Sequence, residues 1–119
     1  MINEQNAVII ELMKNNRVII EELKTALIAH FGEDIIDVIL FGSQASGKAH
    51  KDSDFDILIV LGNDYTWVDE EKIISVVYSI ELKHEIFIDL KLISKRDLFQ
   101  TIKGKHPLYR DAIYEGIHA

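Results

Sequence analysis

The sequence predicts one α/β (α+β) domain, and three observations support this fold class. The chain has 119 residues, 48% hydrophobic and 28% charged, which suits a single globular domain with its own core. Several stretches carry apolar residues at the three- and four-residue spacings of amphipathic helices. Between them lie short apolar runs typical of strands. We expect residues 1–16 to form an N-terminal helical extension and residues 17–119 to form the core.

The first predicted element is helical. Apolar residues recur at helical spacing from Asn3 to Phe31, and Gly32 suits the position just after a helix. Asn15-Asn16 interrupts the pattern, so it is compatible with two helices, over 3–14 and 17–31, or with one helix that has a weak point. We expect the apolar stripe, Leu12 included, to pack on a sheet.

A strand, a tight turn and a second strand follow. Residues 35–41 are nearly all apolar, as in a central strand covered on both faces. Gly42 allows a sharp turn and a close approach of phosphate, and Ser43 offers a hydroxyl and an N–H at the start of a short helix predicted over 43–47. In the strand predicted over 54–61, alternation sends Asp54 and Asp56 to one face.

Two carboxylates at the mouth of an apolar strand repel each other unless a cation offsets their charge. Hard oxygen ligands without a nearby His or Cys suit Mg²⁺, which commonly binds one or two carboxylates together with substrate phosphates. In the loop between the strands, Lys48, His50 and Lys51 are within reach of a triphosphate or are simply solvated, and we favour the solvated loop.

The rest of the chain alternates helix and strand. After a Gly62-Asn-Asp turn, a helix is predicted over 67–83, with a buried side formed by Ile73, Ile74, Val77, Ile80 and Tyr78. Just before the helix interior, Tyr65 and Trp67 either stack on a base or a partner, or pack at the helix entrance.

Asp89 stands at the centre of the next apolar strand, predicted over 84–93. An acidic residue in an apolar strand is rarely buried without a partner, and the ammonium group of Lys91 or Lys83 is a candidate for an ion pair. A short capped helix over 94–100 and a last helix from Pro107 to residue 114 or 115, stopped by Gly116, complete the predicted elements.

Composition excludes several classes of protein. The formal net charge of −7 is opposite to the basic surface of a protein that grips nucleic acid. The absence of cysteine is compatible with the cytoplasm, where we expect the protein to act. No signal peptide or membrane-spanning run is apparent. His30, His84, His106 and His118 lack metal-ligand spacing, so we expect structural roles for them.

The segment from Gly42-Ser43 through ten residues to Asp54-x-Asp56 resembles the signature of the DNA polymerase β-like nucleotidyltransferase superfamily. The chain is similar to the smallest branch, the minimal nucleotidyltransferases, whose genes often sit beside HEPN-domain partners. The resemblance covers about residues 17–118. It implies a mixed sheet with helices packed mainly on one face, and a closing helix followed by a short strand.

The resemblance also implies an activity: transfer of a nucleoside monophosphate, AMP from ATP, to an acceptor hydroxyl with release of pyrophosphate. It assigns two Mg²⁺ ions to Asp54 and Asp56, with Asp89 as the third carboxylate at the attacking oxygen and acceptor of the hydroxyl proton. Gly42 and Ser43 would hold the β and γ phosphates. For HEPN-associated members it implies an antitoxin that adenylylates a tyrosine of its toxin.

One departure from the family stands out. Many members carry Arg at the position of Ser46, so a phosphate-binding or loop-bracing cation is missing, and Lys48 is the candidate to replace it. Two other functions stay open: a binding module that neutralises its HEPN partner by contact alone, and a subunit that nucleotidylates a small molecule such as an aminoglycoside. The sequence leaves the oligomeric state open.

Overall fold

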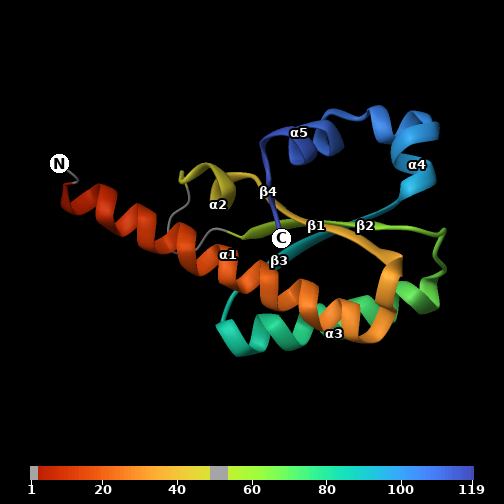
Figure 1. The fold of residues 1–119 in the computed structure, drawn as a ribbon, viewed down its shortest axis with the longest axis horizontal. Coiled ribbons are helices and arrows are strands. Elements are labelled where there is room, and N and C mark those ends of the chain that lie inside the picture. Colours follow the sequence, from red (N-terminus) through yellow and green to blue (C-terminus); the bar gives the residue numbers. More distant parts are fainter. Residues whose placement is uncertain (1–2, 49–53) are drawn as a thin grey trace.

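The computed structural model describes residues 3–48 and 54–119. Its centre is a four-stranded mixed sheet in the order β3-β2-β1-β4 (Figure 1). Strand β1 is antiparallel to both of its neighbours, whereas β2 and β3 are parallel. The strands are β1 Ile35–Phe41, β2 Phe55–Leu61, β3 Ile88–Ser94 and β4 Ile117–His118. The predicted α+β class with a mixed sheet is confirmed.

The two long helices lie on one face of the sheet and the C-terminal helices on the other (Figure 1). Helices α1, Glu4–Phe31, and α3, Trp67–His84, share the larger core with alternate residues of β1 and β2. On the opposite face, α4, Lys95–Gln100, and α5, Pro107–Glu115, cover a smaller cluster. Short connections complete the chain: α2 Ser43–Ser46, η1 Gly32–Asp34 and η2 Ile102–Lys105.

The larger core is closed by the C-terminal half of α1. Ile20, Leu23 and Leu27 recur at helical spacing and are completely buried. Each contributes about 1.5–3 kcal/mol through removal of its side chain from water. The N-terminal half of α1 projects past the sheet (Figure 1), and Val8 and Leu12 are about half exposed. The expectation that Leu12 packs on the sheet is therefore wrong.

Helix α1 is continuous through Asn15-Asn16, so the single-helix alternative holds. Asn16 is buried where the apolar stripe would otherwise continue, and its side-chain amide donates hydrogen bonds to Gln44. A buried polar side chain with a partner costs little, which explains why the helix does not break. Asn3 caps the helix by accepting a hydrogen bond from the Asn6 N–H.

Most predicted boundaries agree with the structure, but the third strand does not begin at residue 84. Helix α3 runs through His84, and Glu85 ends it in a left-handed conformation, with its N–H bonded to the Glu81 carbonyl. The strand therefore starts at Ile88.

The predicted buried side of α3 is partly wrong. Ile73, Val77 and Ile80 are buried as expected, but Val76 takes the remaining core position. Ile74 and Tyr78 are exposed because they lie on the outer side of the helix.

Within the described part of the chain, no helix combines the length and apolarity needed to cross a lipid bilayer.

Candidate active site

Two of the predicted site residues lie side by side on neighbouring strands. In the parallel pairing of β2 with β3, Asp56 is the direct register partner of Asp89. Registered neighbours point to the same face of a sheet, here the face covered by α5. Asp54 comes just before β2 with an exposed side chain. Strands β2 and β3 thus each contribute one carboxylate to this face, Asp56 and Asp89.

The charges of these carboxylates act on Asp56. Burial raises the pKa of Asp56, and the negative charges of Asp89 and Asp54 raise it further, while Lys91 opposes the shift. The repulsion expected between crowded carboxylates is therefore present at Asp56. A divalent cation bound to these oxygens would relieve the repulsion, and carboxylate oxygens are the donors that a hard metal ion prefers.

Asp89 also has a partner in the chain itself. The Lys91 ammonium group lies 3.1 Å from Asp89 Oδ1, two residues along the same face of β3. Both side chains are substantially exposed, at 40% for Lys91 and 49% for Asp89, so this ion pair is weak. Across residues 3–48 and 54–119, no set of three His, Cys, Asp or Glu side chains is arranged to hold a metal ion.

Gly42 brings the turn against Asp56. The residue has φ 71° and ψ −152°, a conformation that side-chain-bearing residues avoid. A Cβ atom at Gly42 would lie 2.3 Å from Asp56 Oδ2. Only glycine satisfies both the backbone conformation and the close approach, so the β1–α2 turn lies directly beside the carboxylate of β2.

The remaining predicted binding residues lie after this turn. Ser43 is the first residue of α2, and Lys48 is exposed just past its end, with its backbone N–H bonded to the Ser43 carbonyl. No described contact fixes the direction of the Lys48 side chain. His50 and Lys51 lie outside the described residues.

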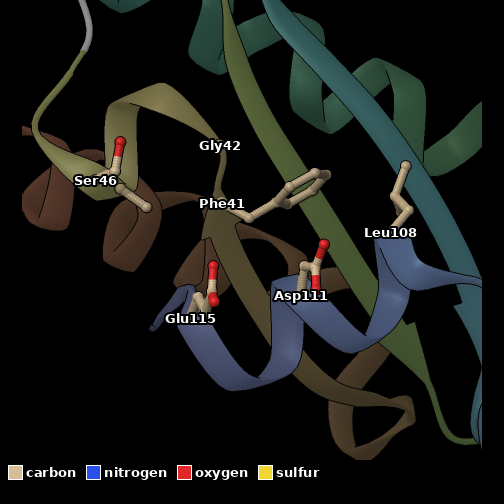
Figure 2. Close-up of a pocket in the computed structure, with 7 residues that line it drawn as sticks. Phe41, Gly42, Ser46, Leu108, Asp111 and Glu115 are labelled. Atoms are coloured by element: carbon tan, nitrogen blue, oxygen red, sulfur yellow. The ribbon is translucent and has the colours of Figure 1, made fainter.

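A pocket of about 340 Å³ adjoins Gly42 on the α5 side. Figure 2 shows Asp111 and Glu115 of α5 facing this pocket, across from Ser46. The two acidic residues are one helical turn apart, so they present negative charge to the same space. The pocket is lined by Phe41, Gly42, Ala45, Ser46, Leu108, Asp111 and Glu115.

Comparison with known proteins identifies the family. A model of the nucleotidyltransferase domain matches residues 20–117, which is most of the chain. The chain belongs to the nucleotidyltransferase domain family. The match begins inside α1, after the part of this helix that projects beyond the sheet.

Two relatives come from Methanocaldococcus jannaschii, and both are named "Putative protein adenylyltransferase". MJ1305 is 35% identical over 100 residues, covering 82% of this chain and 65% of that protein. MJ0141 is 36% identical over 70 residues, covering 59% of this chain and 71% of that protein. The nucleotidyltransferase domain described here thus spans less than two thirds of the length of MJ1305.

A solved structure shares the fold. A chain in the crystal structure of the toxin-antitoxin MntA-HpeT mutant superposes with a TM-score of 0.57 at 14% sequence identity. The superposition covers 82% of this chain and 69% of that chain. At this level of identity the likeness concerns the nucleotidyltransferase fold alone.

Three residues near the site of this nucleotidyltransferase domain were not predicted from the sequence to belong to it. Asn16 supports the turn from α1: its Nδ2 lies 2.9 Å from Gln44 Oε1. The sequence signal for Asn16 is its place three residues before Ile19, where the apolar stripe of the helix would otherwise continue. For Asp111 and Glu115 the signal was their spacing of four residues in a predicted helix.

The four histidines that were expected to have structural roles all have hydrogen-bond partners within the chain. His84 contacts Glu22 on α1, and His118 contacts Asp37 on β1. His30 bonds to a carbonyl of its own helix, and His106 accepts from the Leu108 N–H at the start of α5. Tyr65 donates from its hydroxyl to the Leu92 carbonyl, which agrees with packing rather than stacking on a base.

Proposed function

We propose that this chain catalyses the Mg²⁺-dependent transfer of AMP from ATP to a hydroxyl group of a partner protein in the cytoplasm. The favoured acceptor is a tyrosine of a HEPN-domain toxin, whose activity the modification would silence. The observation that carries the proposal is the registered pair of Asp56 and Asp89 beside the Gly42 turn. Family membership and the names of the relatives support the reaction class.

Asp54, Asp56 and Asp89 would hold two Mg²⁺ ions, with Asp89 on the side of the attacking hydroxyl. A divalent ion at this position supplies charge neutralisation and polarises the phosphoryl oxygens. Burial raises the pKa of Asp56, and so do the negative charges of Asp89 and Asp54, which such an ion would offset.

In the reaction, the acceptor oxygen forms a bond to the α phosphorus of ATP as the bond from this phosphorus to the bridging oxygen of pyrophosphate breaks. Asp89 accepts the hydroxyl proton. The protein contributes mainly by positioning these oxygens in line and by stabilising charge on the phosphates.

Gly42, Ser43 and Lys48 would hold the triphosphate. Gly42 brings the turn beside Asp56, Ser43 offers its hydroxyl and N–H, and Lys48 supplies positive charge that Ser46 lacks. The carboxylates of Asp111 and Glu115 repel phosphate, so the triphosphate would lie on the Ser43 side of Gly42 rather than in the pocket.

To test the proposal, the purified HEPN-domain product of the adjacent gene would be incubated with this chain, Mg²⁺ and ATP. We expect a mass increase of whole AMP units on a tyrosine of the partner, and none when Mg²⁺ is removed with chelator. A partner of unchanged mass, with the chain folded and ATP in excess, contradicts the proposal.

A second function is neutralisation of the partner by contact alone. The contact between Asp89 and Lys91 supports it, because it gives Asp89 a partner within the chain. Asp54→Ala and Asp56→Ala distinguish the two functions: both abolish neutralisation if it is enzymatic and leave it intact if contact suffices. Glu33→Ala is the matched control, because Glu33 is exposed and lies just before the start of β1, at the end of the strand opposite to the Gly42 turn.

A further inference from the structure

Strand β3 is the outermost strand on its side of the sheet, and it carries Asp89 as its second residue. An outer strand has one row of main-chain groups that face no other strand. The proposed catalytic carboxylate and this unpaired edge therefore belong to the same segment.

The register shows which groups point outward. The Phe55 N–H donates to the Phe87 carbonyl, and Asp56 pairs with Asp89. In a parallel pair every second residue directs both main-chain groups to the neighbour. Phe87, Asp89 and Lys91 therefore face β2, whereas Ile88, Leu90 and Leu92 direct their N–H and C=O groups away from it.

Side chains already bind the two ends of this outward row. The Ile88 N–H donates to Glu81 Oε2 at 2.9 Å, and the Leu92 carbonyl accepts from the Tyr65 hydroxyl at 3.1 Å. In the part of the chain that the structure describes, the groups between them have no partner. These are the Ile88 carbonyl, both main-chain groups of Leu90 and the Leu92 N–H.

We propose that this window on β3 binds an extended segment of the acceptor protein as an added strand. The inference rests on the proposed function and names the docking surface of the same site. Four donors and acceptors at strand spacing are complementary to another polypeptide backbone. Phe87, which is 77% exposed directly before the strand, adds an apolar contact at one end of the window.

Strand addition also positions the reacting residue. One residue of the added strand pairs with Leu90, and a neighbour of that residue lies opposite Asp89. The Cβ atoms of this neighbour and Asp89 would be about 4.5–5.5 Å apart. Its side chain points to the face that carries Asp56 and Asp89. A tyrosine side chain at this position is long enough to carry its hydroxyl over Asp89 toward Asp56, whereas a serine side chain is too short.

The test combines two variants of Leu90. Proline is tolerated in an edge strand where the N–H faces outward, so Leu90→Pro removes one docking group while the pairing with β2 remains. Leu90→Val keeps the N–H and shortens the side chain, and serves as the control. The probe is the purified HEPN-domain product of the adjacent gene, with AMP transfer and hydrogen exchange at residues 90 and 92 as readouts.

We expect Leu90→Pro to raise the KM for the partner about tenfold, because one main-chain hydrogen bond is lost and the added strand fits the edge less well. Affinity for Mg²⁺-ATP should stay at the wild-type value, and Leu90→Val should behave like the wild type. In the wild-type complex the amides of Leu90 and Leu92 should exchange more slowly than in the free chain.

Each other outcome is decisive. Wild-type transfer by Leu90→Pro, or an equal loss in Leu90→Val, overturns strand addition while the proposed function stands. If the wild type transfers no AMP, the proposed function fails, and slowed exchange at Leu90 in the complex then still supports docking at this edge. Unchanged exchange overturns it, as does protection that depends on the concentration of this chain alone, which would assign the edge to a second copy.

Discussion

Two separate constraints require glycine at position 42. Its backbone conformation disfavours every other residue, and the space that a Cβ would take is occupied by the Asp56 carboxylate. The sequence showed the first constraint as a turn between two strands. The second depends on how closely β2 approaches the turn, which no local pattern reveals.

Gly42→Ala should therefore reduce both the stability of the fold and the activity. We expect a loss of about 1–3 kcal/mol in the free energy of unfolding from the backbone alone, and an approximately 100-fold fall in AMP transfer from displacement of Asp56. Denaturant unfolding and transfer kinetics measure the two effects. Gly32→Ala is the matched control, because Gly32 has φ 59° but nothing within 4 Å of its Cβ position. Equal activity in both variants would contradict this account.

The charges of Asp111 and Glu115 should weaken the binding of ATP. We expect Asp111→Asn combined with Glu115→Gln to tighten Mg²⁺-ATP binding about threefold at low salt, because two like charges beside the triphosphate are removed. Titration calorimetry at two salt concentrations measures the change. Glu33→Gln, exposed and outside the pocket, shows the effect of removing one remote charge. Weaker binding in the double variant would mean that these carboxylates contact the nucleotide.

His118 makes one contact of the C-terminal strand dependent on pH. Burial acts to lower the pKa of His118, but the hydrogen bond from its ring to Asp37, the Ile113 carbonyl and the charge of Asp37 together raise it above 6.5, against Lys24. The protonated ring therefore stabilises the fold below the unfolded-state value near 6.5, and this stabilisation is lost as pH rises through the folded-state value.

Accordingly, His118→Gln should cost more stability at about pH 5.5 than at about pH 9. Thermal unfolding of the wild type and the variant across this range measures the difference. His30→Gln, whose ring contacts a carbonyl rather than a carboxylate, shows the effect of removing a histidine in general. A cost that is independent of pH would contradict the role of the Asp37 ion pair.

At the scale of elements, helix α1 serves both the core and the site. Its C-terminal half closes the core with Ile20, Leu23 and Leu27, and Asn16 reaches α2. The helix also contacts α3 through Glu22, which pairs with Lys83 and His84. The hydrogen bond from Lys83, followed by that from His84, lowers the pKa of Glu22. The stabilisation from this contact is therefore present above the usual pKa of a glutamate and is lost as the pH falls through the lowered value.

Asn16→Ala should loosen the turn that carries Gly42 and Ser43. We expect a loss of about 1–3 kcal/mol in unfolding free energy, because a buried hydrogen bond is removed, together with weaker ATP binding. Asn15→Ala changes the exposed neighbour and should be close to neutral. Denaturant melts and nucleotide titrations of both variants decide. Similar losses in the two variants would show that helix propensity, and not the contact with Gln44, is responsible.

At the scale of the whole molecule, we propose that the folding unit begins near Asn16. The family match begins at residue 20, and the preceding turns of α1 project beyond the sheet with Val8 and Leu12 exposed. Removal of residues 1–13 should cost less than about 1 kcal/mol, a shift of Tm below about 6 °C, with ATP binding unchanged. Unfolding of the shortened chain would instead make these residues part of the core domain.

The sequence by itself determined the order and type of the elements, because apolar periodicity and turn residues are local properties. It also predicted that Asp54 and Asp56 share a face, but the strand begins at Phe55, so alternation within β2 applies to Asp56 and not to Asp54. It misplaced the start of β3 and the outer side of α3, because the end of a helix at Glu85 and the rotation of a helix against a sheet depend on packing.

Only the tertiary structure decided which distant residues meet. The register of β2 with β3 brings Asp56 to Asp89, the approach of β2 to the turn excludes a side chain at Gly42, and Asn16 reaches Gln44 across 28 residues. It also left the edge of β3 unpaired beside Asp89. These contacts depend on strand order and register, which arise when separate segments bury their apolar faces together.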